Sequence, residues 1–293
     1  MANGGGQRGH ARCFGQDIMR GENPKLTAPG LTWVGGDRDG EGLDETSRKN
    51  LAASSSGTSI FDPVLCELAY SWFCPPGGSI LDPFAGGSVR GIVAAKLGHL
   101  YCGIDLREEQ IAANREQAAR ITPENGPTWV VGDSRNVATL APGEFDLLFS
   151  CPPYADLERY SEDQADLSTM EYPQFVEAYR AIVAASLAKL KPDRFACFVV
   201  GEVRGGKQGN YRGFVPDTIR AFEDAGASYY NEAILVTAVG SLPIRAGKQM
   251  QATRKLGKTH QNVLVFVKGD AKRAAEACGP VEIIEMQEEA ADV

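Results

Sequence analysis

The sequence lacks several features that would place it in a specialised class of protein. No run of about 20 apolar residues, the length that a membrane-spanning helix needs, occurs in its 293 residues. The N-terminal stretch MANGGGQRGHARCFG has no apolar core of the kind found in signal peptides. We therefore expect a cytoplasmic protein, in a bacterial cell or a phage-infected host, with no membrane partner.

Clustered metal ligands and paired cysteines are missing as well. The seven cysteines are scattered without a CxxC pair, and the three histidines, His10, His99 and His260, do not accompany them. Such spacing argues against both a zinc site and a disulfide framework. We predict no bound metal, and reduced cysteines fit the cytosol.

Excess positive charge, the usual sign of general nucleic-acid affinity, is also absent, because the net charge is −8. The charge is unevenly placed, however. A basic strip without any acid lies in residues 241–260, whereas residues 270–293 hold seven acidic residues against two basic ones. A local basic strip within an acidic protein can bind phosphates, although it is equally compatible with a solvated loop. The basic residues of the strip are Arg245, Lys248, Arg254, Lys255 and Lys258.

Composition divides the chain into three parts. Residues 1–57 are rich in Gly, Ser and charge and are predicted to form a loosely ordered arm. Residues 58–269 are regular in pattern and form the main domain. Residues 270–293 form an acidic tail.

Strand-like and helix-like segments alternate through residues 79–226. This order predicts an α/β fold with a mostly parallel sheet, helices on both faces and an antiparallel pair at the C-terminal end. The predicted strands are 79–84, 100–106, 128–133, 145–150, 195–203, 229–239 and 262–269, and the predicted helices are 61–73, 88–98, 107–121, 172–190 and 214–227.

Four loops are predicted to gather at the carboxyl ends of the strands, where open α/β sheets bind ligands. The loop DPFAGGS has two glycines, Gly86 and Gly87, that let the backbone approach a ligand closely. Asp105 ends the next strand, where a carboxylate can accept hydrogen bonds from a ribose, and Asp133 could accept from an adenine amine. Each acid could equally be a carboxylate that caps a helix.

The fourth loop contains the stretch LLFSCPPYADL. Pro152 and Pro153 fix their own φ angles and donate no backbone hydrogen bond, so they form a rigid elbow after a buried strand. Tyr154 follows as an aromatic side chain, either facing a ligand or filling a gap in the core.

The four loops together, DPFAGGSVRG, GIDL, GDS and CPPY, resemble those of the amino-methylating DNA methyltransferases, which use S-adenosylmethionine (SAM) to modify adenine N6 or cytosine N4. The segment TSIFDPVLCELAYSWFCPPGGSILDPFAGGSVRG also looks like the methylases carried by actinobacterial phages, and this implies a role in protecting a genome from restriction. The resemblance covers about residues 58–269. It implies a Rossmann-like methyltransferase fold.

The resemblance also implies roles for individual residues. Tyr154 would stack on a flipped or single-stranded base, and the Pro152 carbonyl would accept one hydrogen of its amine. The catalytic elbow would comprise Cys151, Pro152, Pro153 and Tyr154. The cofactor residues would be Thr58, Ser59, Phe61, Asp82, Pro83, Phe84, Ala85, Gly86, Gly87, Asp105, Leu106, Asp133, Ser134 and Ser150.

Cys151 departs from the family, which has Asp, Asn or Ser at this position to accept the second amine hydrogen. Cysteine is a poor acceptor, and Ser150 is one candidate to compensate. We favour adenine over cytosine as the target. Attack by the Cys151 thiolate on a pyrimidine, as in cytosine-C5 methylation, is an alternative, as are an RNA or protein-glutamine substrate and a non-catalytic protein that binds SAM and DNA.

DNA recognition is assigned to two short loops, residues 201–213 and 240–260, with phosphate contacts from the basic strip. Gln249 and Gln251 are candidates to read base edges, and Glu202 is a candidate to orient the base or the elbow. Since no large recognition domain is present in the sequence, we predict a short target sequence or help from a second copy or an accessory partner.

Overall fold

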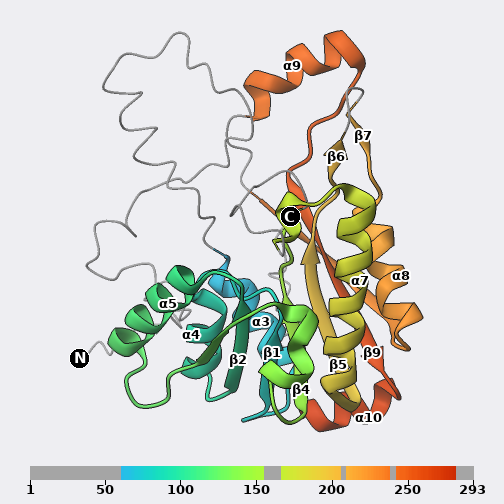
Figure 1. The fold of residues 1–293 in the computed structure, drawn as a ribbon. Coiled ribbons are helices and arrows are strands. Elements are labelled where there is room, and N and C mark those ends of the chain that lie inside the picture. Colours follow the sequence, from blue (N-terminus) through green and yellow to red (C-terminus); the bar gives the residue numbers. More distant parts are fainter. Residues whose placement is uncertain (1–60, 155–165, 206–208, 238–241, 282–293) are drawn as a thin grey trace, which may run out of the picture.

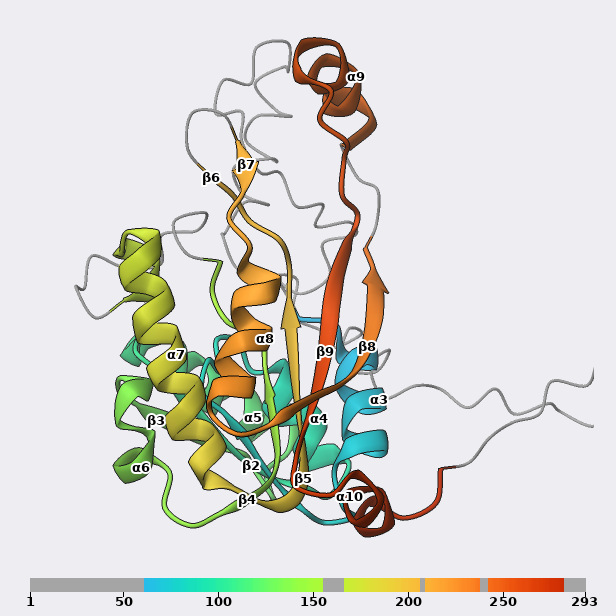
Figure 2. The same ribbon diagram turned by 90° about the vertical axis from the view of Figure 1, so that its right-hand side faces the viewer.

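The computed structural model describes residues 61–154, 166–205, 209–237 and 242–281 (Figure 1). Within these ranges the chain forms one large twisted sheet covered by helices on both faces, as the views of Figures 1 and 2 show, and a separate two-stranded pair. The arm 1–57, together with Thr58 and Ser59, lies outside the described residues.

The described residues form a sheet of seven strands in the order β3-β2-β1-β4-β5-β9-β8. The first five strands of this order are parallel, whereas β9 is antiparallel to both β5 and β8. This confirms the expected Rossmann-like methyltransferase fold, including the antiparallel pair near the C-terminus. The strands are β1 (Ser79–Asp82), β2 (Leu100–Asp105), β3 (Thr128–Val131), β4 (Phe145–Ser150), β5 (Leu190–Val200), β8 (Ser228–Val236) and β9 (His260–Lys268).

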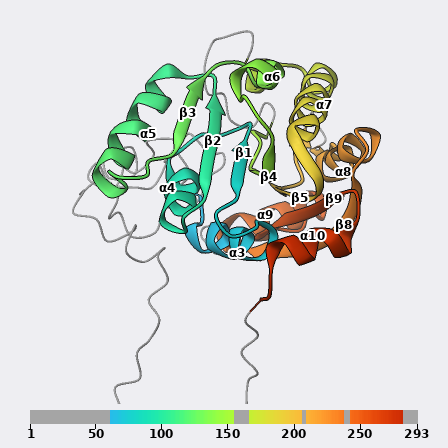
Figure 3. The same ribbon diagram turned by 90° about the horizontal axis from the view of Figure 1, so that it is seen from below.

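The helices are divided between the two faces of the sheet, as seen from below in Figure 3. Side chains of α3, α4, α5 and α10 enter one hydrophobic core, and those of α6, α7 and α8 enter the other. Their bounds are α3 (Pro63–Phe73), α4 (Val89–Lys96), α5 (Glu108–Ile121), α6 (Val137–Leu140), α7 (Tyr172–Lys189), α8 (Phe214–Asp224) and α10 (Ala271–Cys278). In the described part of the chain, the 3₁₀ helices are η1 (Ser134–Asn136) and η3 (Leu167–Thr169).

Period-two alternation explains how the central strands serve both cores. In β5, Phe195, Cys197 and Val199 enter the core under α3, while Phe198 and Val200 enter the core under α7 and α8. All six residues of β4 are buried, as expected for a central parallel strand covered on both sides.

Helix boundaries follow local capping chemistry. The Asp62 side chain accepts a 2.8 Å hydrogen bond from the Val64 N–H, and Pro63 occupies the first turn of α3, where no donor is needed. Helix α8 begins after Gly213, whose φ of 90° is easily reached only by glycine. These signals are local. The start of α8 agrees with the prediction, whereas α3 begins at Pro63, two residues later than predicted, because Asp62 is its cap.

Three segments differ from the sequence-based expectations. The basic segment 240–260 is largely helical, because α9 (Leu242–Thr253) occupies most of it. The segment 201–213 carries the short antiparallel pair β6 (Arg204–Gly205) and β7 (Asn210–Tyr211). Helix α10 lies within the range predicted as a tail, yet its residues Ala274 and Cys278 are buried in the core under α3, so the packed domain continues through Cys278.

None of the helices in the described ranges combines the length and the apolar character that crossing a membrane requires. Among the same residues, no group of three or more His, Cys, Asp or Glu side chains is arranged to hold a metal ion.

Candidate active site

The loops predicted to form the site follow four strands that are neighbours in the sheet. The order β3-β2-β1-β4 places the ends of these parallel strands side by side. Asp82 pairs with Gly103, two residues before the end of β2, and Asp105 pairs with Val131 at the end of β3. The glycine turn, Asp105, Asp133 and the elbow are therefore at one edge of the sheet, as predicted.

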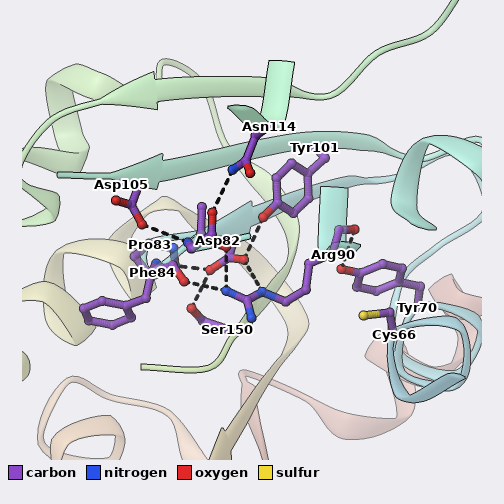
Figure 4. A network of polar contacts seen from close by, with 12 residues as sticks. Cys66, Tyr70, Asp82, Pro83, Phe84, Arg90, Tyr101, Asp105, Asn114 and Ser150 are labelled. Atoms are coloured by element: carbon purple, nitrogen blue, oxygen red, sulfur yellow. Dashed lines mark hydrogen bonds and ion pairs between the residues drawn. The ribbon is translucent and has the colours of Figure 1, made fainter. Parts of the chain in front are cut away.

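The glycine turn that links β1 to α4 is held by hydrogen bonds from β2 and α5 (Figure 4). The Gly86 N–H donates to Asp105 Oδ2 at 2.9 Å, and Asn114 Nδ2 donates to the Gly86 carbonyl at 2.7 Å. Gly86 has a φ of +48°, a conformation that side-chain-bearing residues rarely adopt. Apart from Gly87 and its chain neighbours, no atom of the described residues lies within 4 Å of the position that a Cβ on Gly87 would occupy, so these residues leave open space beside the turn.

The Asp82 side chain has no exposed surface and holds the turn in place through hydrogen bonds. Its Oδ1 accepts hydrogen bonds from the Phe84 N–H (3.1 Å) and the Ser150 hydroxyl (2.5 Å). Its Oδ2 accepts from Arg90 Nε (2.5 Å) and from the Tyr101 hydroxyl (2.7 Å), and Figure 4 shows these groups converging on the carboxylate. With four donors already bound, Asp82 holds the turn in place instead of contacting a ligand through its side chain.

Several other residues predicted to bind the cofactor also have buried side chains. Ala85 and Ser150 have none of their surface exposed, and Ser134 is buried with its hydroxyl donating to the Pro83 carbonyl at 2.5 Å. The Ser150 hydroxyl donates to Asp82, and the Ser150 side chain has no exposed surface. It therefore points into the protein, and this argues against Ser150 as a replacement for the acceptor that Cys151 lacks.

Arg90 is the part of the site that the sequence analysis missed. Its guanidinium donates to the carbonyls of Phe84 (2.5 Å) and Ala85 (2.9 Å), and it lies 4.8 Å from the centre of the Phe61 ring. Burial alone would lower the pKa of Arg90, but the Asp82 carboxylate raises it above its ordinary value. A signal was present in the sequence, because an arginine lies inside the apolar run VRGIVAA, and the helix buries this position.

The two acids at the ends of β2 and β3 differ in their surroundings. Asp105 accepts hydrogen bonds from two backbone N–H groups, those of Gly86 and Arg107, and its side chain is 15% exposed. Burial raises the pKa of Asp105, and these N–H groups and the Arg107 charge only partly oppose the effect. Asp105 thus lies between the turn and solvent, as the ribose prediction requires.

Asp133 caps the 3₁₀ helix η1 and pairs with the neighbouring arginine. It accepts from the Arg135 N–H at 2.9 Å, and its Oδ2 lies 2.5 Å from Arg135 Nη2. Burial raises the pKa of Asp133, but these Arg135 contacts outweigh it and lower the pKa below the ordinary value. The capping alternative therefore holds for Asp133.

The elbow follows β4 and lies against β5, β9 and α8. Pro152 is buried, whereas Cys151, Pro153 and Tyr154 are half-buried. The Tyr154 ring meets Phe214 edge-on at 6.2 Å, and its hydroxyl is hydrogen-bonded to the Gln261 side chain. A Cβ on Gly201 would lie 3.4 Å from this ring, so glycine leaves room for it. The ring is packed on one side without being sealed in the core.

A hollow of about 300 Å³ lies close to the elbow, beside Glu202, the residue after Gly201. Glu202 accepts hydrogen bonds from the N–H groups of Gly213 (3.3 Å) and Val215 (3.0 Å), so it caps α8. Burial lowers the pKa of Lys258, which also lines the hollow, although Glu202 and Glu232 act against the shift. The lining residues are Glu202, Tyr211, Val215, Pro216, Lys258, His260 and Asn262.

The basic residues predicted to contact DNA are spread over α9 and the segment after it. Lys248 and Arg254 are exposed, whereas Lys255 and Lys258 are partly buried. The Arg245 side chain lies outside the described part of the chain. In Figures 1 and 2, α9 stands beyond the same end of the sheet as the β6–β7 pair.

No protein-family model matches the sequence, and no curated protein sequence matches it. Solved structures similar to this chain include TrmN from Thermus thermophilus, with 16% identity, a TM-score of 0.49, and 73% of this chain and 51% of TrmN covered. Magnesium protoporphyrin IX methyltransferase from Synechocystis PCC 6803, solved with bound SAM, has 13% identity, a TM-score of 0.46, and 79% and 100% covered. A TehB-like SAM-dependent methyltransferase from Corynebacterium glutamicum has 21% identity, a TM-score of 0.44, and 76% and 95% covered.

The chain thus spans about half the length of TrmN. With TM-scores below 0.5 and identities below 25%, these similarities carry no argument about activity, and the fold assignment rests on the strand order and directions.

Proposed function

We propose that this protein is a SAM-dependent methyltransferase that acts on the exocyclic amine of a flipped DNA base, with adenine N6 favoured over cytosine N4. One observation carries the proposal. The glycine turn and the Pro-Pro-Tyr elbow follow β1 and β4, which are paired neighbours in the sheet, so a donor at the turn and a base at the elbow would meet at one edge.

The residues around the turn fit the proposed cofactor. The open space beside Gly87 leaves room for a ligand against the backbone, and Asp105 presents a partly exposed carboxylate next to it. Asp105 is suited to accept hydrogen bonds from ribose hydroxyls. Bound SAM supplies an electrophilic methyl group. Arg90 and Asp82 keep the carbonyl and N–H groups of the turn in position from below.

The elbow supplies the base site. A base inside a duplex cannot present its amine to a cofactor, so it is extruded or single-stranded when it reacts. The half-buried Tyr154 ring offers a stacking surface, and the Pro152 carbonyl accepts one amine hydrogen. The two prolines keep this carbonyl fixed, and preorganised dipoles of this kind stabilise developing charge. Cys151 is a weak acceptor, so the Pro152 carbonyl holds the amine with little help from a side chain.

The choice of DNA rests on the resemblance of the four loops and on the exposed cations of α9 and the segment after it. Lys248 and Arg254 are exposed, and Figure 2 shows that α9 stands beyond the end of the sheet that bears the β6–β7 pair. Exposed cations of this kind can contact DNA phosphates. The described residues contain no separate recognition domain, so a short target sequence, a second copy of the chain or an accessory partner supplies the specificity.

Transfer of labelled methyl groups tests the proposal. Purified protein is incubated with tritiated SAM and with DNA, RNA or a protein extract, and the label is expected in DNA. Label in RNA or protein alone would assign the site to another substrate, and cofactor binding without any transfer would assign a non-catalytic role. Mapping modified bases after expression in a methylation-deficient host then gives the base and its sequence context.

Gly87→Val is the matched negative control for the transfer assay. Its side chain would fill the space beside the turn, where no atom of the described residues, apart from Gly87 and its chain neighbours, lies within 4 Å of the Cβ position. The variant is therefore expected to fold normally and to lose SAM binding and transfer together.

A further inference from the structure

We infer that Ser150 is a positioning residue whose hydrogen bond to Asp82 sets the placement of the elbow relative to the glycine turn. The inference rests on the proposed function and deepens it, since the two loops are the ones that would hold the methyl donor and the base. Ser150 immediately precedes Cys151 and Pro152 in the chain, while Asp82 begins the turn.

The first argument is the shared acceptor. Asp82 Oδ1 accepts both the Phe84 N–H of the turn (3.1 Å) and the Ser150 hydroxyl of β4 (2.5 Å). One carboxylate oxygen therefore contacts both loops, and Figure 4 shows Ser150 and Phe84 on the same side of Asp82. The other oxygen is held by Arg90 and by Tyr101 of β2, which fixes the orientation of the carboxylate.

The second argument is where the backbone pairing between the strands ends. The β1–β4 register runs through Ile80 with Leu147 and Leu81 with Leu148, whereas Ser150 is paired on its other side with Phe198 of β5. At Ser150, beyond the last β1–β4 pair, the side-chain hydrogen bond to Asp82 continues the connection between the two strands.

The third argument is burial. Both side chains have no exposed surface, so water cannot enter to replace the hydrogen bond if one partner is removed. The end of β4 would then be free to shift relative to the turn. A misplacement of about 1 Å between reacting groups can lower a rate by about a hundredfold.

The test is Ser150→Ala with Ser79→Ala as its matched control. Ser79 also donates to a buried aspartate across β1 and β4, at 3.0 Å to Asp146 Oδ2, but at the opposite end of the strands. Ser150→Ala is expected to lower kcat for methyl transfer by about tenfold to a hundredfold while the Kd for SAM stays within about twofold. Ser79→Ala is expected to leave both constants unchanged.

A second measurement does not depend on methyl transfer. S-adenosylhomocysteine is added to each protein, and amide hydrogen exchange is followed in peptides that cover residues 145–154. In the wild type and in Ser79→Ala the ligand is expected to slow exchange at the amides of Cys151 and Tyr154. In Ser150→Ala this protection is expected to be reduced, although the ligand still binds.

The inference is overturned if Ser150→Ala retains the wild-type kcat and protection, or if Ser79→Ala loses as much as Ser150→Ala. If the wild type transfers methyl to no substrate, the proposed function fails, and the exchange measurement still decides whether the turn and the elbow are coupled. If Ser150→Ala does not fold, Ser150→Cys, which keeps a weak donor, is measured in the same two assays and is expected to lose kcat at unchanged Kd.

Discussion

Strands β1 and β4 are joined by a serine–aspartate hydrogen bond at each end, and the two bonds differ in their surroundings. At the amino end Ser79 of β1 donates to Asp146 of β4, and at the carboxyl end Ser150 of β4 donates to Asp82 of β1. The same residue types connect the same strands in opposite directions. Only the carboxyl-end pair lies next to the glycine turn and the elbow.

The cations that balance the two aspartates make the difference. Asp146 is paired with Lys191 (2.9 Å) and Arg194 (3.1 Å), whose side chains are 38% and 20% exposed. Asp82 is paired with Arg90, whose side chain is 6% exposed. The amino-end pair is thus partly exposed to solvent, whereas the carboxyl-end pair is fully buried. A buried hydrogen-bonded ion pair keeps its geometry more firmly, but the loss of one partner costs more stability.

The largest expected effect comes from removing Asp82, the carboxylate of the buried pair at the carboxyl end. Asp82→Ala leaves the buried Arg90 charge without its partner and is expected to lower the free energy of unfolding by about 3–5 kcal/mol. Asp146→Ala is expected to cost less, about 1–3 kcal/mol, because Lys191 and Arg194 reach solvent. Urea unfolding followed by circular dichroism measures both. Equal losses in the two variants would remove the distinction drawn between the two ends.

The pH dependence of stability sharpens the comparison at the amino end. Burial raises the pKa of Asp146, but hydrogen bonds from Lys191, Ser79 and Arg194 outweigh it and lower the pKa from 3.8 to about 2. A carboxyl with a depressed pKa stabilises the fold above its ordinary pKa, and the contribution is lost as the pH falls through the folded-state value.

Asp146→Asn is therefore expected to lower the free energy of unfolding by about 1–2 kcal/mol at neutral pH, a figure reduced for partial solvation of the cations. The difference from the wild type should stay constant between about pH 7 and 5 and shrink as the pH falls from about 4 to 2. Urea titrations at several pH values measure it. A difference that does not change over this range would contradict the assigned pKa.

The carboxyl end should differ from the amino end in activity as well as stability. Tyr154→Ala removes the proposed stacking surface and is expected to lower methyl transfer to DNA by roughly tenfold, at the lower end of the stacking energies of bases on aromatic rings. Tyr154→Phe keeps the ring, loses the contact of the hydroxyl with Gln261, and is expected to have a smaller effect. Steady-state kinetics with labelled SAM separate the two, and equal losses would assign the role to the hydroxyl instead of the ring.

The smallest expected effect concerns the exposed cations beyond the carboxyl end. Replacing Lys248 and Arg254 by Ala is expected to reduce the slope of log affinity for DNA against log salt by about one for each phosphate that is no longer neutralised, with SAM affinity unchanged. Lys96→Ala, an exposed lysine at the end of α4, serves as the control and should leave the slope unchanged. A double variant with the wild-type slope would place the DNA elsewhere.

Local patterns were enough to predict most of the elements. A short apolar run predicted β4, and apolar residues at helical spacing predicted α7. Helix α9 was missed because Pro243 and Gly247 interrupt its segment, LPIRAGKQMQAT, which contains few large apolar residues. Helix α10 was missed because the acidity of the whole segment hid the short run that buries Ala274 and Cys278.

The candidate site shows the same limit. The sequence analysis correctly predicted that Gly86, Asp105 and Tyr154 lie at one edge of the sheet, because the carboxyl ends of parallel strands meet there. It assigned Asp82 and Ser150 to ligand contacts, although both side chains are buried and bound to each other. The sequence analysis assigned Arg90 no role, since the local sequence does not show which groups a buried arginine contacts.

The sequence by itself determined which residues follow each strand, because the succession of strands along the chain, the glycine turns and the effect of the prolines depend on neighbouring residues. Only the tertiary structure decided which way those side chains face and what they bind. Asp82 and Ser150 are 68 residues apart in sequence, and Ser79 and Asp146 are 67 apart, yet one pair ties together the two loops of the site and the other only clamps the fold. A hydrogen bond acts over about 3 Å, so its partners are fixed only when the sheet has brought distant segments together.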